Sequence, residues 1–408
     1  MQEAHNQQIA KLFLTMILVV VVSGCSGTPG SRGDQTTDKA RVPLGYRSLY
    51  NELNTKLDRL LSSVDADRDG RKSDVSLGVE LLVANSNRGD VLLTDRVFGA
   101  TRLTLNRLKD LGVHCIALSI QYPILTSSFP RAAEYRTFYR RVAGEIRRMG
   151  FKLIVEIGTT FRESEFSKLK VDYRGLTMAR FRDGLREMAA VIATDIQPDY
   201  LTLFTEPDTQ SHNTGLQFTV KNFSETVRHV AGNLKHPGVR LGAGAGTWDD
   251  MTYFEALARI PELDYLDLHI YPIQRDLVMN RVMRVAALAQ RHNKSVSIGE
   301  AWLYKVSGRE LRTISPVKAF ARDVFSFWQP LDIKFLETVI GLSHKIQAEF
   351  TCFFWMKYFY GYLDYNAHTK NLTPQQRINA VDSLTGGNIV NNSLGNTGER
   401  FKTLIAPQ

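Results

Sequence analysis

From residue 76 to the end of the chain, short apolar runs rich in β-branched residues alternate with patterns typical of helices. The helical patterns carry apolar residues at spacings of three and four, as in Phe181, Leu185, Met188 and Ile192, so each helix buries one face. Eight strand–helix units in about 330 residues predict an α/β protein built as a (β/α)8 TIM barrel. Strands are predicted at residues 76–83, 113–120, 152–157, 200–204, 239–243, 265–270, 295–298 and 351–355.

A doubly wound open sheet is the other architecture that alternating strands and helices can form. It is less favoured because no glycine-rich phosphate loop follows the first strand. The candidate site residues also come from strands that are widely separated in the chain, and a barrel brings the ends of such strands together.

Two glutamates stand where an apolar run stops and a loop begins. Glu206 ends the run Leu-Thr-Leu-Phe-Thr-Glu, and Glu300 ends the run Ser-Val-Ser-Ile-Gly-Glu. In a barrel, side chains at the carboxyl ends of the strands converge on the active site. The sequence therefore predicts that these two carboxylates form a pair. Glu80 on the first strand and Glu156 on the third are rival carboxylates.

The segments around the pair, Thr205-Glu206-Pro207 on strand four and Gly299-Glu300-Ala301-Trp302 on strand seven, resemble clan A of the glycoside hydrolases. The resemblance covers most of the chain from residue 76. Enzymes of this clan are retaining (β/α)8 barrels, so the resemblance implies that Glu206 is the general acid/base and Glu300 the nucleophile. It also implies an extracellular oligo- or polysaccharide as substrate, and neither a metal nor an organic cofactor.

The sixth strand carries polar residues on one face, because Tyr265, Asp267, His269 and Tyr271 alternate with other residues at a period of two. The segment His269-Ile-Tyr271-Pro resembles the strand-six segment of the clan, in which a tyrosine hydroxyl bonds the nucleophile carboxylate. The resemblance therefore implies that His269 and Tyr271 belong to the substrate site.

Tryptophans follow three of the predicted strands. Trp355, at the end of strand eight, matches the aromatic floor on which the clan stacks a sugar ring. Trp248 after strand five and Trp302 after strand seven could widen that platform, since the apolar faces of sugars pack on indole rings. The alternative is that these side chains only fill the rim of the barrel.

Thr205 departs from the pattern of the clan. It stands immediately before Glu206, where the clan carries an asparagine whose amide holds the sugar 2-hydroxyl. A threonine hydroxyl is shorter and has a single donor. Three interpretations stay open, namely an unusual substituent at carbon 2, a water-bridged contact, or a catalytically weak glycan-binding protein of the same fold. An unrelated barrel enzyme that abstracts protons with glutamate is a further alternative.

The region before the barrel predicts export. Residues 12–22 form an apolar run of 11 residues, which is too short to span a bilayer and is typical of a secretory signal. The following Val22-Ser-Gly-Cys25 resembles the lipobox of bacterial lipoproteins, which implies a signal peptide over residues 1–24 and lipidation of Cys25. Ser26 in place of aspartate favours the outer membrane in a host that has one. An ordinary signal without a lipid is the alternative.

Residues 25–42 are polar and rich in Gly and Ser, which predicts a flexible tether. Residues 43–75 predict an amphipathic helix and a turn, and residues 76–408 form the predicted barrel. The formal net charge of +9 is modest and no nucleic-acid motif accompanies it. Arginine pairs on one predicted helix indicate a solvated face, and an anionic polysaccharide or surface is the less favoured interpretation.

Asp65, Asp67 and Asp69 have the opening spacing of a calcium-binding loop. The twelfth position of that loop is serine where a bidentate glutamate is needed, so an acidic turn is predicted and calcium is the alternative. Cys115 and Cys352 both lie in apolar, strand-like runs far apart in the chain. We therefore predict two buried thiols rather than a disulfide.

Overall fold

The computed structural model describes residues 42–65, 74–163, 165–234, 238–274, 277–311 and 313–406. The predicted signal peptide, Cys25 and nearly all of the predicted tether lie outside these ranges, as do Asp67 and Asp69 of the acidic turn. Within the described ranges, no helix combines the length and the apolar character that crossing a membrane requires.

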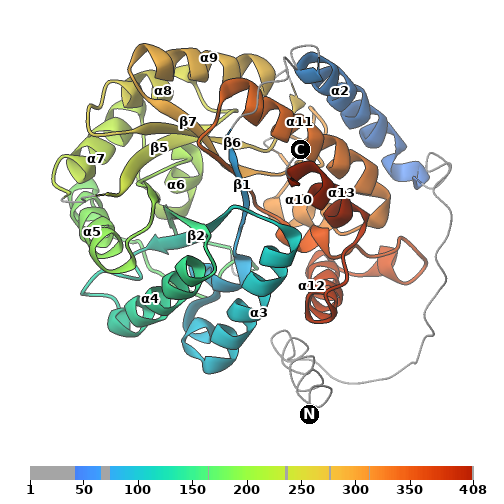
Figure 1. Ribbon diagram of the computed structural model, residues 1–408, viewed down its shortest axis with the longest axis horizontal. Coiled ribbons are helices and arrows are strands. Elements are labelled where there is room, and N and C mark those ends of the chain that lie inside the picture. The colour runs from blue at the N-terminus through green and yellow to red at the C-terminus, as the bar shows by residue number, and fades with distance from the viewer. Residues whose placement is uncertain are drawn as a thin grey trace.

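Eight parallel strands close into a barrel in chain order, and the last strand pairs with the first (Figure 1). This closure confirms the TIM barrel and excludes the open doubly wound sheet. Each predicted run overlaps one observed strand, and the predicted and observed boundaries differ by three residues at most. The strands are β1 (Ser76–Glu80), β2 (Cys115–Tyr122), β3 (Lys152–Thr159), β4 (Tyr200–Thr202), β5 (Arg240–Gly246), β6 (Tyr265–Ile270), β7 (Ser295–Ala301) and β8 (Phe350–Phe353).

Helices surround the strands as an outer layer (Figure 1). Threonine side chains accept backbone N–H bonds at the amino ends of α3, α5, α7 and α12, and such caps contribute about 1 kcal/mol each. The helices are α2 (Arg47–Asp65), α3 (Asp95–Leu111), α4 (Ala132–Arg148), α5 (Met178–Val191), α6 (Pro207–Thr214), α7 (Val220–Ala231), α8 (Met251–Ala258), α9 (Met279–Arg291), α10 (Pro316–Asp323), α11 (Gln329–Ile346), α12 (Pro374–Asn391) and α13 (Asn396–Ile405).

The predicted N-terminal helix is α2, which packs beside α11 on the outside of the barrel (Figure 1). Leu53 and Leu57 are fully buried in this contact. Gly341 on α11 allows a close approach, because a methyl group there would lie 2.3 Å from Cγ1 of Val64. Lys334 Nζ also bonds Asp58 on α2.

Apolar side chains fill the barrel interior at the amino ends of the strands. This cluster consists of Cys115, Ala117, Ile154, Tyr200, Tyr265, Phe350 and Cys352. The two cysteine sulfurs lie 3.9 Å apart as free thiols, which confirms the prediction of buried thiols without a disulfide. They meet where Gly78 of β1 pairs with both Cys115 and Cys352. The apolar plug closes one end of the barrel, so polar chemistry is confined to the other.

Gly78 packs closely against β2, since an added Cβ would lie 2.0 Å from the Cys115 carbonyl oxygen. We predict that Gly78→Ala lowers the free energy of unfolding, measured in urea, by about 2 kcal/mol through overpacking. Gly99→Ala is the control, because Gly99 is exposed on α3 and an added methyl group contacts nothing. That variant should gain about 0.5–1 kcal/mol. Equal effects of the two substitutions would contradict the steric account.

Candidate active site

Glu206 lies in a strained turn between β4 and α6. Its backbone has φ 47° and ψ 69°, in the left-handed region that costs a residue with a side chain about 1–3 kcal/mol. Pro207 follows at the first position of α6, where its fixed φ starts the helix. The Glu206 side chain makes no capping bond to this helix, and its Oε1 instead lies 2.8 Å from Nδ1 of His269. The strain therefore aims the carboxylate across the barrel mouth.

Glu300 is directed inward by an irregularity in β7. The pairing of β6 with β7 shifts between Leu268 and His269, so that His269 lies opposite Glu300. Gly299 is the skipped residue, and an added Cβ there would lie 2.3 Å from Oδ2 of Asp267. A bulge of this kind re-aims a side chain. It turns Glu300 toward the interior, the side to which Ser297 already points.

Tyr271, just beyond β6, donates its hydroxyl to Glu300 Oε2 at 2.6 Å. This is the contact that the resemblance implies for the nucleophile. Tyr265, Asp267 and His269 all make polar contacts inside the barrel, as the period-two pattern predicts. The sixth strand therefore supplies a row of polar groups that runs from the apolar cluster at Tyr265 to the mouth at His269 and Tyr271.

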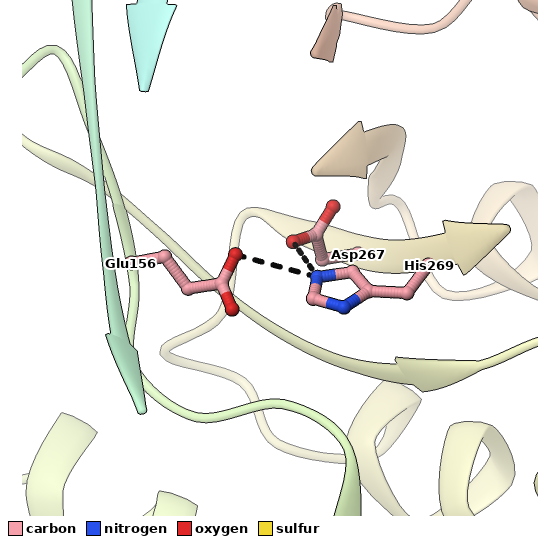
Figure 2. A group of neighbouring side chains, drawn as sticks. All are labelled: Glu156, Asp267 and His269. Carbon is pink, nitrogen blue, oxygen red and sulfur yellow. Dashed lines mark ion pairs between the residues drawn. The ribbon is translucent and has the colours of Figure 1, made fainter. Parts of the chain in front are cut away.

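His269 is the centre of the site. Its side chain is 1% exposed, and its ring nitrogens lie within ion-pair distance of the carboxylates of Glu156, Glu206, Asp267 and Glu300. Figure 2 shows Nε2 between Glu156 and Asp267, at 3.3 Å and 3.7 Å. Burial opposes a charged imidazole, but the carboxylates of Glu156 and Glu300 outweigh it and raise the pKa of His269 well above its usual range. The surrounding carboxylates therefore favour the imidazolium form of the ring.

Glu156 belongs to the site, although sequence analysis treated it only as a rival without a family motif. It lies on β3 in register with Thr202, on the inward face. Its Oε1 accepts a hydrogen bond of 2.8 Å from the Thr205 hydroxyl. The period-two alternation of β3 was the signal that could have placed it here. Thr205 therefore uses its single donor on a neighbouring carboxylate.

The two candidate catalytic carboxyls hold their protons differently. Burial raises the pKa of Glu206, but the bond to the His269 imidazolium and its charge outweigh this effect and leave the pKa below its usual range. Burial and the charge of Glu156 raise the pKa of Glu300 well above its usual range. The free site therefore favours a proton on Glu300. This order is opposite to the acid and nucleophile roles that the resemblance implies.

Aromatic rings line one side of the mouth in a connected row. Trp248 lies 6.0 Å from Tyr271, Tyr271 lies 6.1 Å from Phe354, and Phe354 lies 4.6 Å from Trp355. Trp248 and Trp355 are partly exposed, and the Trp248 indole N–H donates to Asp208. Trp355 lies two residues beyond the end of β8 rather than at its last position. These two tryptophans are available to stack on a ligand.

Trp302 lies elsewhere. Its backbone N–H still bonds Ile270 on the neighbouring strand, and its side chain stacks on Tyr358 at 5.7 Å. It is 1% exposed, so no face of the indole is open to a sugar. The structure thus does not bring Trp302 to the platform predicted for it, because the ring is used in packing.

Among the described residues, two groups of side chains have the spacing of metal ligands, Glu156 with Asp267 and His269, and Glu206 with His269 and Glu300. Both groups depend on the same imidazole. A histidine must be neutral to bind a metal, whereas the surrounding carboxylates keep His269 protonated. A metal ion at this place would therefore have to displace the proton of His269.

No protein-family model and no curated protein sequence matches this chain. Among solved structures, it is similar to the exo-β-1,4-mannosidase Op5Man5 from Opitutaceae bacterium strain TAV5, with 13% identity, coverage of 83% of this chain and 61% of that chain, and a TM-score of 0.52. It is also similar to a family 5 xyloglucanase from Paenibacillus pabuli, with 12% identity, coverage of 77% and 99%, and a TM-score of 0.48. The chain spans less than two thirds of the mannosidase. At these identities the likeness establishes the barrel fold.

Glu80 on β1 provides a test of the electrostatics beneath the site. Burial raises its pKa to about 7, although Asn85 and Ser119 donate hydrogen bonds to it. A carboxyl with a raised folded-state pKa stabilises the fold most below its unfolded-state pKa, and this contribution is lost as the pH rises through the folded-state value. Relative to Glu80→Gln, the wild-type protein should lose about 3 kcal/mol of unfolding free energy between about pH 4 and about pH 8.

Chemical unfolding across this pH range measures that difference. Glutamine keeps the shape and cannot ionise, so subtracting the two stability curves removes titrations that both proteins share. A constant difference across the range would contradict a proton held on Glu80 in the folded state.

Proposed function

We propose that this chain is a retaining glycoside hydrolase in which Glu206 and Glu300 act as a pair. The main support is their separation, since a carboxylate oxygen of each residue and a ring nitrogen of His269 all lie within 4.8 Å of one another. Retaining enzymes hold the two carboxyl groups about 5–5.5 Å apart, whereas inverting enzymes need about 6.5–9.5 Å to admit a water. The short separation favours direct attack by one glutamate.

In this mechanism, Glu300 forms a bond to the anomeric carbon while the glycosidic bond breaks and Glu206 protonates the leaving oxygen. Glu206 then takes a proton from a water molecule, which attacks the same carbon and releases Glu300. The Tyr271 hydroxyl, 2.6 Å from Glu300 Oε2, orients the nucleophile. Trp248 and Trp355 offer surfaces on which the sugar rings stack.

The first step requires the proton on Glu206, whereas the free site favours it on Glu300. His269 Nδ1 lies 2.8 Å from Glu206 Oε1 and 3.9 Å from Glu300 Oε2. The imidazolium can give its Nδ1 proton to Glu206 and then take up the proton that Glu300 releases. We propose that His269 sets this proton distribution when substrate enters.

A second candidate function is a catalytically weak glycan-binding barrel, which the Thr205 substitution and the proton on Glu300 favour. A barrel enzyme that abstracts a proton from carbon is a third. Only the hydrolase passes through a glycosyl ester on a glutamate, so trapping that ester separates the hydrolase from the other two functions.

We predict that a 5-fluoro glycosyl fluoride of the correct sugar adds one glycosyl mass to the peptide containing Glu300, because the fluorine slows release of the intermediate. Peptide mass spectrometry over a panel of sugars checks this. Glu300→Ala should lose the label.

Glu206→Ala should lose about 10²–10⁴-fold activity on substrates with poor leaving groups, because these need a proton from the acid, and it should regain turnover when azide is added. A product of inverted anomeric configuration would exclude the mechanism.

We also propose that the barrel acts in the cell envelope, anchored through a lipid on Cys25 at the outer membrane of a host that has one. The supporting observation is the lipobox-like segment that ends at Cys25. Several acyl chains anchor a protein stably, whereas one binds only marginally. A lipid anchor would place the enzyme among extracellular glycans.

Cys25→Ala should therefore abolish incorporation of a fatty-acid analogue and release the protein from the membrane fraction. Cys115→Ala is the matched control, because that thiol is buried inside the barrel and should not affect labelling. Wild-type protein with an unmodified N-terminus other than Cys25 would rule out the anchor and leave the barrel chemistry unaffected.

A further inference from the structure

The carboxylate beside the position before Glu206 is the acceptor that faces the barrel mouth, since the Glu156 side chain is 12% exposed. Thr205 is 1% exposed and its hydroxyl donates to Glu156 Oε1 at 2.8 Å, so Thr205 has no donor left for a ligand. The Glu156 carboxylate beside it has no donor either. A sugar hydroxyl can donate a single hydrogen bond to such a site. A protonated amine has three donors and no acceptor, and it matches the site fully.

The charge of the cleft points to the same kind of ligand. The side chains of Glu156, Glu206 and Glu300 are 12%, 15% and 16% exposed. Within the described chain, the ion pairs of these three carboxylates are all made with His269. The mouth therefore carries more negative than positive charge, although the whole chain has a formal charge of +9.

Two further carboxylates extend this charge along the cleft. Burial and the charge of Glu206 raise the pKa of Asp208, and burial and the charge of Asp208 raise the pKa of Asp249 to about 8. Asp208 accepts a hydrogen bond from the indole N–H of Trp248, so it lies beside the row of aromatic rings that begins at Trp248. Burial is the larger cause of both pKa shifts, and repulsion between the carboxylates adds to it, so a cation at this place would be stabilised.

Buried atoms under the mouth also lack partners. Oε2 of Glu80, on a side chain that is 1% exposed, has no hydrogen-bond partner in the described chain. Nε2 of His269 makes no hydrogen bond there either, and its contacts with the carboxylates of Glu156 and Asp267 are ion pairs of 3.3 Å and 3.7 Å. Unsatisfied buried polar atoms are costly, about 1–3 kcal/mol each, and in a native protein they often mark a functional site. They lie around Glu156, which interacts electrostatically with both groups.

We propose that the sugar held by Glu206 and Glu300 is an amino sugar with a free, protonated amine, and that Glu156 selects it by pairing with the ammonium group. The inference rests on the proposed glycosidase function and names its substrate class. Amino sugars commonly carry the amine at carbon 2, next to the anomeric carbon. A neutral hydroxyl would add no positive charge beside Glu156, which shares the His269 imidazolium with three other carboxylates, and an acetamido group would bring a carbonyl acceptor to a surface made of acceptors.

An ammonium group at this place also prepares the nucleophile. Among neighbouring charges, Glu156 contributes most to keeping a proton on Glu300. A cation paired with Glu156 offsets that repulsion, so Glu300 ionises when the correct substrate binds. The proton that it loses is then available, through His269, to Glu206. Substrate recognition and the proton arrangement needed for attack are thereby coupled.

The experiment compares aryl glycosides of glucosamine and galactosamine with those of glucose, galactose and N-acetylglucosamine, in both anomers. The ratio of kcat/KM for free-amine over hydroxyl or acetamido substrates should be about 30-fold or more, and Glu156→Gln should remove that preference. Glu349→Gln is the matched control, since Glu349 lies just before β8 at the opposite end of the barrel and is paired with Arg240. It should keep the preference.

Binding of glucosamine oligosaccharides, followed by calorimetry, tests selection without turnover. Tight binding that Glu156→Gln loses and Glu349→Gln keeps supports the inference even if no substrate is cleaved, and in that case the hydrolase proposal alone fails. Cleavage of neutral sugars as fast as amino sugars, or a preference that survives in a folded Glu156→Gln protein, would overturn the inference and leave the hydrolase proposal standing. Loss of activity on adding a chelator would assign the acidic group to a metal and also overturn it.

Discussion

The contact between the buried His269 imidazolium and its carboxylates determines the arrangement of the site. Glu156, Glu206, Asp267 and Glu300 come from separate parts of the barrel, and all four lie within ion-pair distance of that one ring. Four buried carboxylates without a cation would repel one another and take up protons. The imidazolium offsets part of this cost and connects the residues into one network, so the proton on each depends on the others.

The network needs space and unusual backbone geometry, which β5, the bulge in β7 and the turn after β4 supply. Along β5, added Cβ atoms at Gly242, Gly244 and Gly246 would collide with Tyr265, Asp267 and Trp248 respectively. Gly299 similarly makes room for Asp267, and the bulge there turns Glu300 inward. The left-handed backbone of Glu206 turns the second carboxylate to the same place. Strain and missing side chains thus occur where function requires close approach.

The interior also separates structural from chemical tasks along the barrel axis. Apolar residues, with Cys115 and Cys352 among them, close the amino ends of the strands, and polar residues occupy the carboxyl ends. Ser297 and Thr202 bond Asp267 between these layers. The apolar layer keeps the network away from water on one side, which strengthens its electrostatics. Glu156, Glu206 and Glu300 are 12%, 15% and 16% exposed at the polar carboxyl ends of the strands.

The sequence by itself determined the barrel, because eight alternations of period-two and period-3.6 patterns specify parallel strands covered by helices. Strand ends, one strand face and the resemblance to clan A of the glycoside hydrolases together predicted that Glu206, Glu300, His269 and Tyr271 share one site. The structure brings these side chains together, and their roles stay predictions. Tertiary structure decided the rest. The structure places Glu156 in the site and buries Trp302 outside it. Which side chains meet across a barrel depends on strand register, on the bulge at Gly299 and on packing from distant helices. A local sequence pattern contains none of this information.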